Sequence, residues 1–193
     1  MRFVDFHPNV RLRIGLNFFT NLLSNMFTPF MAVYFAQTLG TTIAGITTVL
    51  SIVVMLIFSS LGGHYADQIG RKKVMLLSET LVLASFLIMA AVNSPWMHSA
   101  AITLVMTIIM SAGAGLGLPA NDAMLIDVTT AESRKAMYRI TYWSNNLSVS
   151  IAGMIGGYLF GEYLFQLFLA CAVMSLITLA VTKVFIAETL HAE

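Results

Sequence analysis

The sequence predicts an all-α membrane protein with six transmembrane helices. Its 193 residues are 58% hydrophobic and only 10% charged, whereas soluble domains average about 45–50% and about 25%. Apolar stretches of about 20 residues recur along the chain, which is the length a helix needs to cross a bilayer core of about 30 Å. A soluble domain of this size could not cover its surface with so few charges, so the lipid bilayer is the expected environment.

Six apolar segments follow one another, separated by short polar joints. Each is rich in Leu, Met, Ala and Phe, and none shows the alternation of apolar and polar residues over about 10 positions that barrel strands show. The predicted helices cover residues 14–39, 42–66, 74–92, 99–123, 137–161 and 164–185. We therefore expect residues 1–193 to form one six-helix transmembrane domain.

All ten Lys and Arg residues fall on one side of this arrangement, and the other three joints, around Gly40, Ser94 and Glu162, contain none. Because cytoplasmic loops carry an excess of Lys and Arg, both termini are predicted to be cytoplasmic. The expected location is the cell membrane, with a bacterial cytoplasmic membrane favoured. The basic residues are Arg2, Arg11, Arg13, Arg71, Lys72, Lys73, Arg134, Lys135, Arg139 and Lys183.

The first helix carries a ridge of amides. Asn17, Asn21 and Asn25 recur every four residues behind Arg13, so they share one face of the helix. Hydrocarbon does not solvate amides, so this face is expected to meet protein or a wet cavity. The ridge either lines a translocation path or holds helices together through hydrogen bonds.

The joint between the second and third helices reads "GHYADQIGRKK". Its Gly63, Asp67, Gly70, Arg71 and Lys72 resemble the loop signature of the major facilitator superfamily, which lies between that family's second and third helices. In the family, this cluster latches the two halves of the transporter in the outward-facing state. An Asp at a helix C-terminus is disfavoured by the helix dipole unless a cation is near, and Arg71 can supply one. The alternative is that the basic residues serve only as a topology signal.

A second stretch is similar to drug:proton antiporters of this superfamily, of the LmrP-like multidrug exporter type. The similarity covers Ala123–Asp127, Ala131–Lys135 and the run Tyr142–Val149, together with "LRIG" before the first helix and "AETL" after the sixth. By this resemblance, Asp127 matches an acid that communicates with the loop signature, and Arg13 matches a basic residue at the start of helix one. The resemblance further implies the N-terminal half of a twelve-helix bundle, with the substrate site between two halves. The missing C-terminal six-helix half is thus an expected partner.

Two acids inside the helices are candidates for proton chemistry. Thr141 stands where the LmrP-like pattern has a carboxylate, whereas Asp122 is acidic where that pattern has an amide. Asp122 is therefore a candidate proton site, and the alternative is a solvated residue near a helix end. Glu79, in the third helix, either reaches the basic loop at Arg71–Lys73 or binds a proton.

The fifth helix offers two further features. Gly153, Gly157 and Gly161 form a doubled small-xxx-small pattern, which predicts close packing against another helix. Trp143 and Asn146 are expected to shape the cavity together with the asparagine ridge.

No enzymatic motif is present: the sequence contains no GxSxG, HExxH or CxxC. Cys171 is the single cysteine, and the four histidines lack metal-ligand spacing. We expect neither an enzyme nor a metal, a cofactor or a nucleic-acid partner.

The predicted function is that of half a secondary active transporter, most simply proton-coupled multidrug efflux by alternating access. Its partners would be protons and apolar or cationic small molecules. Two alternatives stay open: a major facilitator that imports a metabolite, and a non-transporting six-span membrane subunit.

Overall fold

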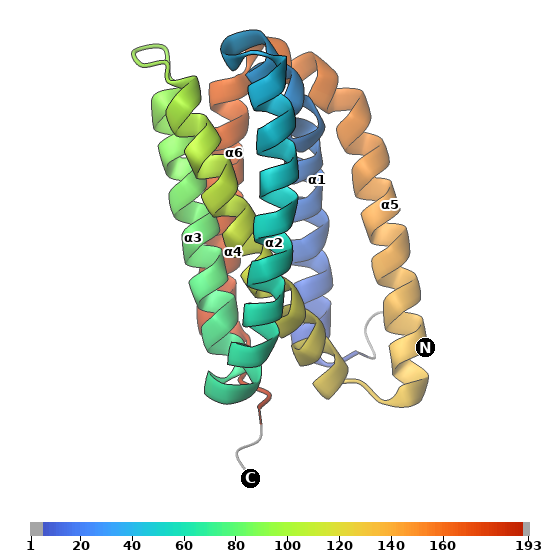
Figure 1. Ribbon diagram of the computed structural model, residues 1–193. Coiled ribbons are helices and arrows are strands. Elements are labelled where there is room, and N and C mark those ends of the chain that lie inside the picture. Colours follow the sequence, from blue (N-terminus) through green and yellow to red (C-terminus); the bar gives the residue numbers. More distant parts are fainter. Residues whose placement is uncertain (1–5, 191–193) are drawn as a thin grey trace.

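The computed structural model describes residues 6–190, which form six α-helices joined by short turns. The helices lie side by side, and the start of α1 and the end of α6 lie at the same end of the bundle (Figure 1). The predicted number and order of helices are confirmed. Arg2 and His191 lie outside the described residues. The helices are α1 (Pro8–Leu39), α2 (Thr41–Ile69), α3 (Arg71–Val92), α4 (Ala100–Asp127), α5 (Ala131–Glu162) and α6 (Leu164–Phe185).

Two helices begin six residues earlier than their apolar pattern suggests, α1 at Pro8 rather than residue 14 and α5 at Ala131 rather than residue 137. Local capping explains both starts. Proline is favoured in the first helical turn, and the ring of His7 accepts a hydrogen bond from the backbone N–H of Asn9 at 3.2 Å. Thr130 and Ser133 form a reciprocal capping box at the start of α5. The apolar pattern thus marked the central part of each helix, and the polar caps set where it begins.

Among residues 6–190, four helices are long and apolar enough to cross a membrane: α2, α3, α4 and α6. Helices α1 and α5 are the longest, with 32 residues each, but they are more polar. The asparagine ridge lies on α1, and charged residues fill the first turns of α5. That α1 and α5 also cross the membrane stays a prediction.

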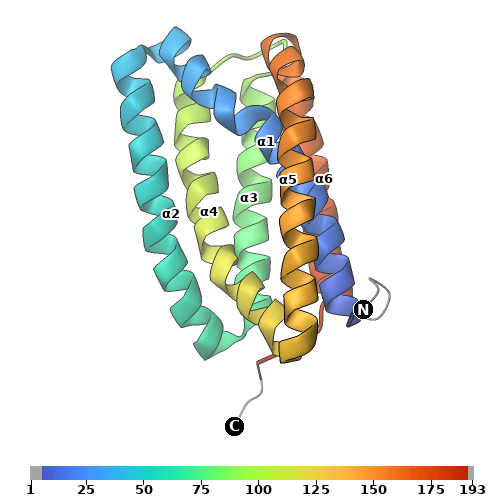
Figure 2. The same ribbon diagram turned by 90° about the vertical axis from the view of Figure 1, so that its right-hand side faces the viewer.

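The bundle is built around α4 and α1. Helix α4 packs between α2 and α3, and α6 packs on α3; α1 contacts α5 closely and also touches α2 and α6. Figure 2 shows α1 running obliquely across the bundle. One core cluster centres on Phe27, whose ring meets those of Phe86 and Phe168 edge-on at centroid distances of 5.4 and 5.6 Å. A second cluster near the chain ends includes Val74 and Met124.

The close approach of α5 to α1 occurs at Gly156. A Cβ at this position would lie 2.6 Å from the backbone oxygen of Met26, whereas one at Gly153 or Gly161 would meet nothing within 4 Å. At Gly157 it would make only ordinary contact with the Phe30 ring, at 3.6 Å. Among the described residues, none of Gly153, Gly157 and Gly161 makes this close approach, and tight packing of these glycines against another helix stays a prediction. The face of α5 that contacts α1 carries Gly156, which is rotated by about 100° around the helix axis from its neighbour Gly157.

Gly156→Ala should separate α5 from α1. The added methyl group meets a backbone atom that cannot rotate away, so we expect the free energy of unfolding to fall by about 1–3 kcal/mol. Thermal unfolding of the 193-residue chain in detergent micelles measures the change.

Gly153→Ala is the matched control, because its Cβ has open space. Alanine is the better helix former by about 1 kcal/mol, so this variant should be as stable as the parent or slightly more so. Equal losses at both positions would contradict the proposed close approach.

Candidate transport site and the charged cluster at the chain ends

A cavity of about 390 Å³ lies inside the bundle, bounded by residues of α1, α2, α3, α4 and α6. We call it the central cavity. Its polar lining comes from α1, α3, α4 and α6. Its bulky apolar side chains come from α2, α3 and α4: Met55, Val82, Phe86, Met110 and Leu118. A space of this size with mixed lining is typical of small-molecule sites.

The asparagine ridge of α1 divides its roles. Asn17 and Asn21 line the central cavity, and the Asn21 amide also donates to the Asn145 side-chain oxygen of α5 at 2.8 Å. Asn25 does not line the cavity, since its amide donates to the backbone oxygen of Asn21 at 2.8 Å. Cavity lining and bonding between helices therefore occur on the same ridge.

Trp143 and Asn146 are placed differently from the prediction. Neither lines the central cavity. Trp143 is 70% exposed, and the Asn146 amide donates to the Tyr142 oxygen of its own helix at 2.7 Å. The part of α5 that carries them contacts α1 through another face. Within this chain they do not line the central cavity, and a role for them in a path shared with a second half stays a prediction.

Arg13 lies at the edge of the central cavity in a group that we call the Arg13 cluster: Arg13, Glu79, Asn121 and Thr182. Its Nη1 lies 2.6 Å from Glu79 Oε1, and both residues are 8% exposed. The Arg13 Nε–H donates to the Asn121 side-chain oxygen, and the Thr182 hydroxyl donates to Glu79 Oε1 at 2.9 Å. The cluster thereby joins α1, α3, α4 and α6 around one buried ion pair.

Glu79 does not reach the basic loop, so that interpretation of the sequence is wrong. It lies eight residues beyond Arg71, about 12 Å along α3. Arg13 was recognised as a basic residue at the start of the first helix, but no sequence signal joined it to Glu79. The two residues are 66 positions apart in the sequence, and they meet because α1 crosses the bundle obliquely.

A second charged group lies at the end of the bundle that carries both chain ends. Arg71 is its centre: its Nη1 lies 3.4 Å from Asp67 Oδ1, and its Nε lies 2.7 Å from Asp127 Oδ2. These ion pairs join the end of α2, the start of α3 and the end of α4. We call Asp67, Arg71, Asp127, Glu188 and Thr189 the end cluster.

The last two members of the end cluster come from the segment after α6. The two carboxylate oxygens of Glu188 accept from the backbone N–H groups of Arg71 and Lys72, at 3.0 and 3.1 Å, and so cap the N-terminus of α3. The Thr189 hydroxyl donates to Asp127 Oδ2 at 2.9 Å. No local sequence pattern identifies Glu188 as a member of the end cluster, because its partners lie 116 and 117 residues away.

The glycines of the loop signature have different surroundings. Gly70 has a φ of +107°, which favours glycine, and a Cβ there would meet Glu188 Oε2 at 2.5 Å. Glycine at this position thus makes both the turn and the approach of the carboxylate possible. Gly63 is in ordinary contact range of the Pro119 ring.

The pKa of Glu188 is lowered from its ordinary value of 4.5. Partial burial alone would raise this pKa, but hydrogen bonds from the backbone N–H groups of Leu190, Thr189, Lys72 and Arg71 lower it by more. The ionised form is therefore the one that holds the segment after α6 against α3.

Asp122 and Thr141 are not joined by any described contact. Asp122 is exposed, with no hydrogen bond or ion pair among residues 6–190, and it does not line the central cavity. The Thr141 hydroxyl is buried without a hydrogen-bond partner. Within the described residues, no group of three or more His, Cys, Asp or Glu side chains is arranged to hold a metal ion.

Glu188→Ala should loosen the start of α3 in a pH-dependent way. Because the folded pKa is depressed, the stabilisation is present above 4.5 and is lost as the pH falls through the folded pKa. We expect a lower Tm than the parent at pH 7, and a difference that shrinks below pH 4.5.

Glu162→Ala serves as the control, because this exposed acid has no ion pair or hydrogen bond from its side chain among the described residues. Its Tm should follow the parent across the whole pH series. A Glu188→Ala deficit that does not depend on pH would contradict the capping role.

The sequence is similar to those of known membrane transporters. The sequence profile described as "Major Facilitator Superfamily" matches residues 14–192. A protein of Planococcus maritimus named "Na(+), Li(+), K(+)/H(+) antiporter" is 31% identical over 193 residues, which is all of this chain and 46% of that protein. The uncharacterized MFS-type transporter YqjV of Bacillus subtilis is 29% identical over 159 residues, 80% of this chain and 37% of that protein.

The fold is also shared with a solved structure. The crystal structure of the human organic anion transporter MFSD10 (TETRAN) superposes with a TM-score of 0.65 at 18% identity, over 95% of this chain and 49% of that one. The chain thus spans about half the length, or less, of these relatives. On the match over residues 14–192, the chain belongs to the Major Facilitator Superfamily, a family of membrane transporters.

Proposed function

We propose that the chain is the first six-helix half of a proton-coupled antiporter that works by alternating access. The observation that carries the proposal is a central cavity with polar and apolar lining residues, inside a bundle that is similar in sequence, over its whole length, to a protein named as a cation/proton antiporter. The second half would close the open side of the cavity and complete the substrate site. Monovalent metal cations are the first candidate substrates, because that relative's name specifies them.

Multidrug export is the second candidate, and a specific feature favours it. Met55, Phe86 and Met110 give the central cavity an apolar wall, and flexible methionine side chains suit ligands of varied shape. A lipophilic cation would place its charge near the asparagines and its apolar body against this wall.

The end cluster would act as a gate in this mechanism. Arg71 ties Asp67 to Asp127 in the described state, so α2, α3 and α4 move together as long as these ion pairs hold. Gly153 and Gly161, whose surroundings in this chain are open, would then be available for contact with the second half. Protonation or substrate binding would bias two arrangements of the halves through such contacts.

Proteoliposomes containing the whole gene product test the function. With a pH-sensitive dye inside and an imposed pH gradient, addition of Na⁺, Li⁺ or K⁺ should dissipate the gradient, because each cation exchanges for a proton. N-methylglucamine is the control cation, and liposomes without protein are the control membrane.

Ethidium added to the same vesicles distinguishes the two candidate substrates. Dissipation by ethidium alone would replace metal cations with drugs as the substrate. Failure of every cation to move protons would contradict proton-coupled antiport and favour a facilitator or a non-transporting subunit.

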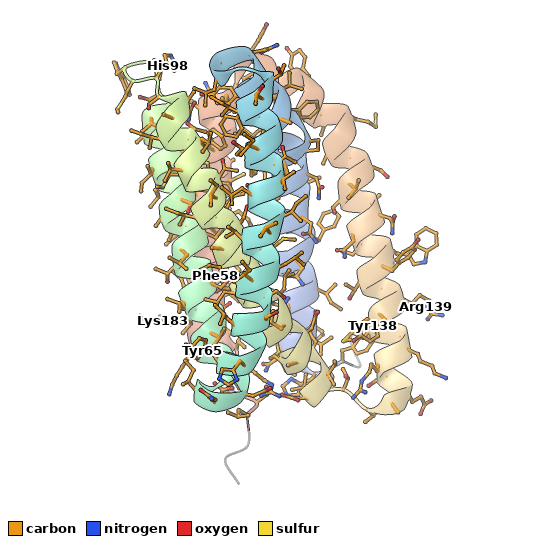
Figure 3. All side chains as sticks on the ribbon, viewed as in Figure 1. Phe58, Tyr65, His98, Tyr138, Arg139 and Lys183 are labelled. Atoms are coloured by element: carbon orange, nitrogen blue, oxygen red, sulfur yellow. The ribbon has the colours of Figure 1, made fainter. Side chains whose placement is uncertain are left out.

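We further propose that the end of the bundle with both chain ends faces the cytoplasm. Figure 3 shows Arg139 and Lys183 toward this end and His98 at the opposite end. In the predicted topology, the nine basic residues within residues 6–190 lie in the turns and helix ends on this side of the bundle. Cytoplasmic loops are enriched in such residues.

Single cysteines on a Cys171→Ala background test the orientation. His98→Cys, in an exposed turn, should react with a membrane-impermeant maleimide in intact cells. Glu132→Cys, which is also exposed, should react only after permeabilisation. Labelling of Glu132→Cys in intact cells would reverse the orientation.

A further inference from the structure

Glu79 carries a carboxylate oxygen that the fold leaves without a partner. Its Oε1 accepts from Arg13 and from Thr182, whereas its Oε2 is buried and has no hydrogen-bond partner among the described residues. The side chain borders the central cavity. Buried carboxylate oxygens are normally satisfied, because desolvation without compensation costs free energy.

A proton is the cation that fits this oxygen best. Oε2 is covered by protein, with under 1 Å² of exposed surface, so a hydrated metal ion has no room to coordinate it. The net charge of the Arg13–Glu79 pair is zero, which further weakens metal binding. Adding a proton to Oε2 removes the buried negative charge without moving the helices.

We propose that Glu79 binds the exchanged proton, and that its protonation uncovers the positive charge of Arg13 toward the central cavity. This inference rests on the proposed antiport function and names the group that carries it out. The proton forms a bond to Oε2, and the Arg13–Oε1 contact changes from an ion pair to a hydrogen bond with a neutral acid. The proton comes from a hydronium ion, whose O–H bond breaks and which is left as water.

This arrangement makes a proton and a cationic substrate exclude each other without sharing a site. With Glu79 ionised, Arg13 is neutralised and a cation can enter the cavity beside it. With Glu79 protonated, Arg13 is an uncompensated charge at the cavity edge, where the low dielectric makes it strongly repulsive to a cation. Binding of one therefore disfavours binding of the other, as antiport requires.

Among residues 6–190, Arg13 is the one charged side chain within ion-pair distance of Glu79. Helices α4 and α6 face Glu79 through the uncharged cluster members Asn121 and Thr182. Among the other titratable groups of α2, α4 and α6, Asp127 pairs with Arg71 and the Cys171 thiol is buried in the core cluster that contains Phe27. The remaining ones are exposed: His64, Tyr65, Asp67, Asp122 and Lys183.

Infrared difference spectra across a pH series detect the proton directly. In the detergent-solubilised gene product, a band from a protonated carboxylic acid should appear as the pH falls, and Glu79→Gln should lack it. Asp122→Asn is the matched control and should keep the band, since Asp122 is exposed. A band that survives in Glu79→Gln, or that disappears in Asp122→Asn instead, would overturn the assignment whether or not the protein transports.

Transport by the same variants separates a proton-binding role from a structural one. Glu79→Gln keeps a hydrogen-bond acceptor for Arg13 and Thr182 but leaves the Arg13 charge uncompensated, as in the protonated state. Cation exchange without a pH gradient should therefore be weakened at every pH, and dissipation of the gradient should be lost. Glu79→Asp should recover part of the proton movement with a shifted pH profile. Wild-type proton movement by Glu79→Gln across the pH series would refute the proposal. Absence of all transport by the parent protein would instead refute the antiport function.

The double variant Arg13→Gln/Glu79→Gln tests the role of Arg13. It removes both charges of the pair, so cation exchange should persist but should no longer respond to pH. Retention of the parent's pH response by the double variant would contradict the role given to Arg13.

Discussion

The Arg13–Glu79 ion pair is the interaction on which the arrangement of the bundle depends. Each partner is almost fully buried, so neither charge can be left alone without a cost of about 3–5 kcal/mol. Arg13 also bonds to α4 and Glu79 to α6. The position of the oblique helix α1 is thus fixed relative to three other helices, and the central cavity exists because α1 is held there.

The ion pairs among the described residues lie at two levels of the bundle. The Arg13 cluster lies beside the central cavity, and the end cluster lies where the chain begins and ends. Between them, α3 runs as one uninterrupted helix from Arg71 to Glu79 and beyond. A rigid helix that carries one charged group in each cluster is a physical link through which both can bias the same rearrangement.

The sequence predicted most of the secondary structure and part of the site. Apolar runs located six helices because hydrophobic length is a local property, and the loop signature indicated that Arg71 could pair with Asp67 because both lie at the same short joint between two helices. The partners Arg13 and Glu79, or Glu188 and Arg71, could not be paired in this way. Their meeting depends on how helices cross and on where the chain returns after α6, and neither is encoded in a local pattern.

The face of α5 that contacts α1 could likewise not be predicted from a local pattern. Its glycine repeat was visible, but which face of the helix meets α1 depends on a rotation of about 100° that periodicity alone does not fix. Gly156, outside the repeat, makes the contact. Trp143 and the repeat glycines remain on surfaces that this chain does not cover.

The capping of α3 by Glu188 has a consequence for biosynthesis. The acceptor for the first amides of α3 is made 117 residues after Arg71, so the ribosome finishes all six helices before the turn at Gly70 can adopt its final form. At elongation rates of about 5–20 residues per second, α3 waits several seconds with its leading amides bonded to water. Newly made helices can therefore enter the membrane and adjust against one another first, and the chain closes its charged end only when the whole unit has been synthesised.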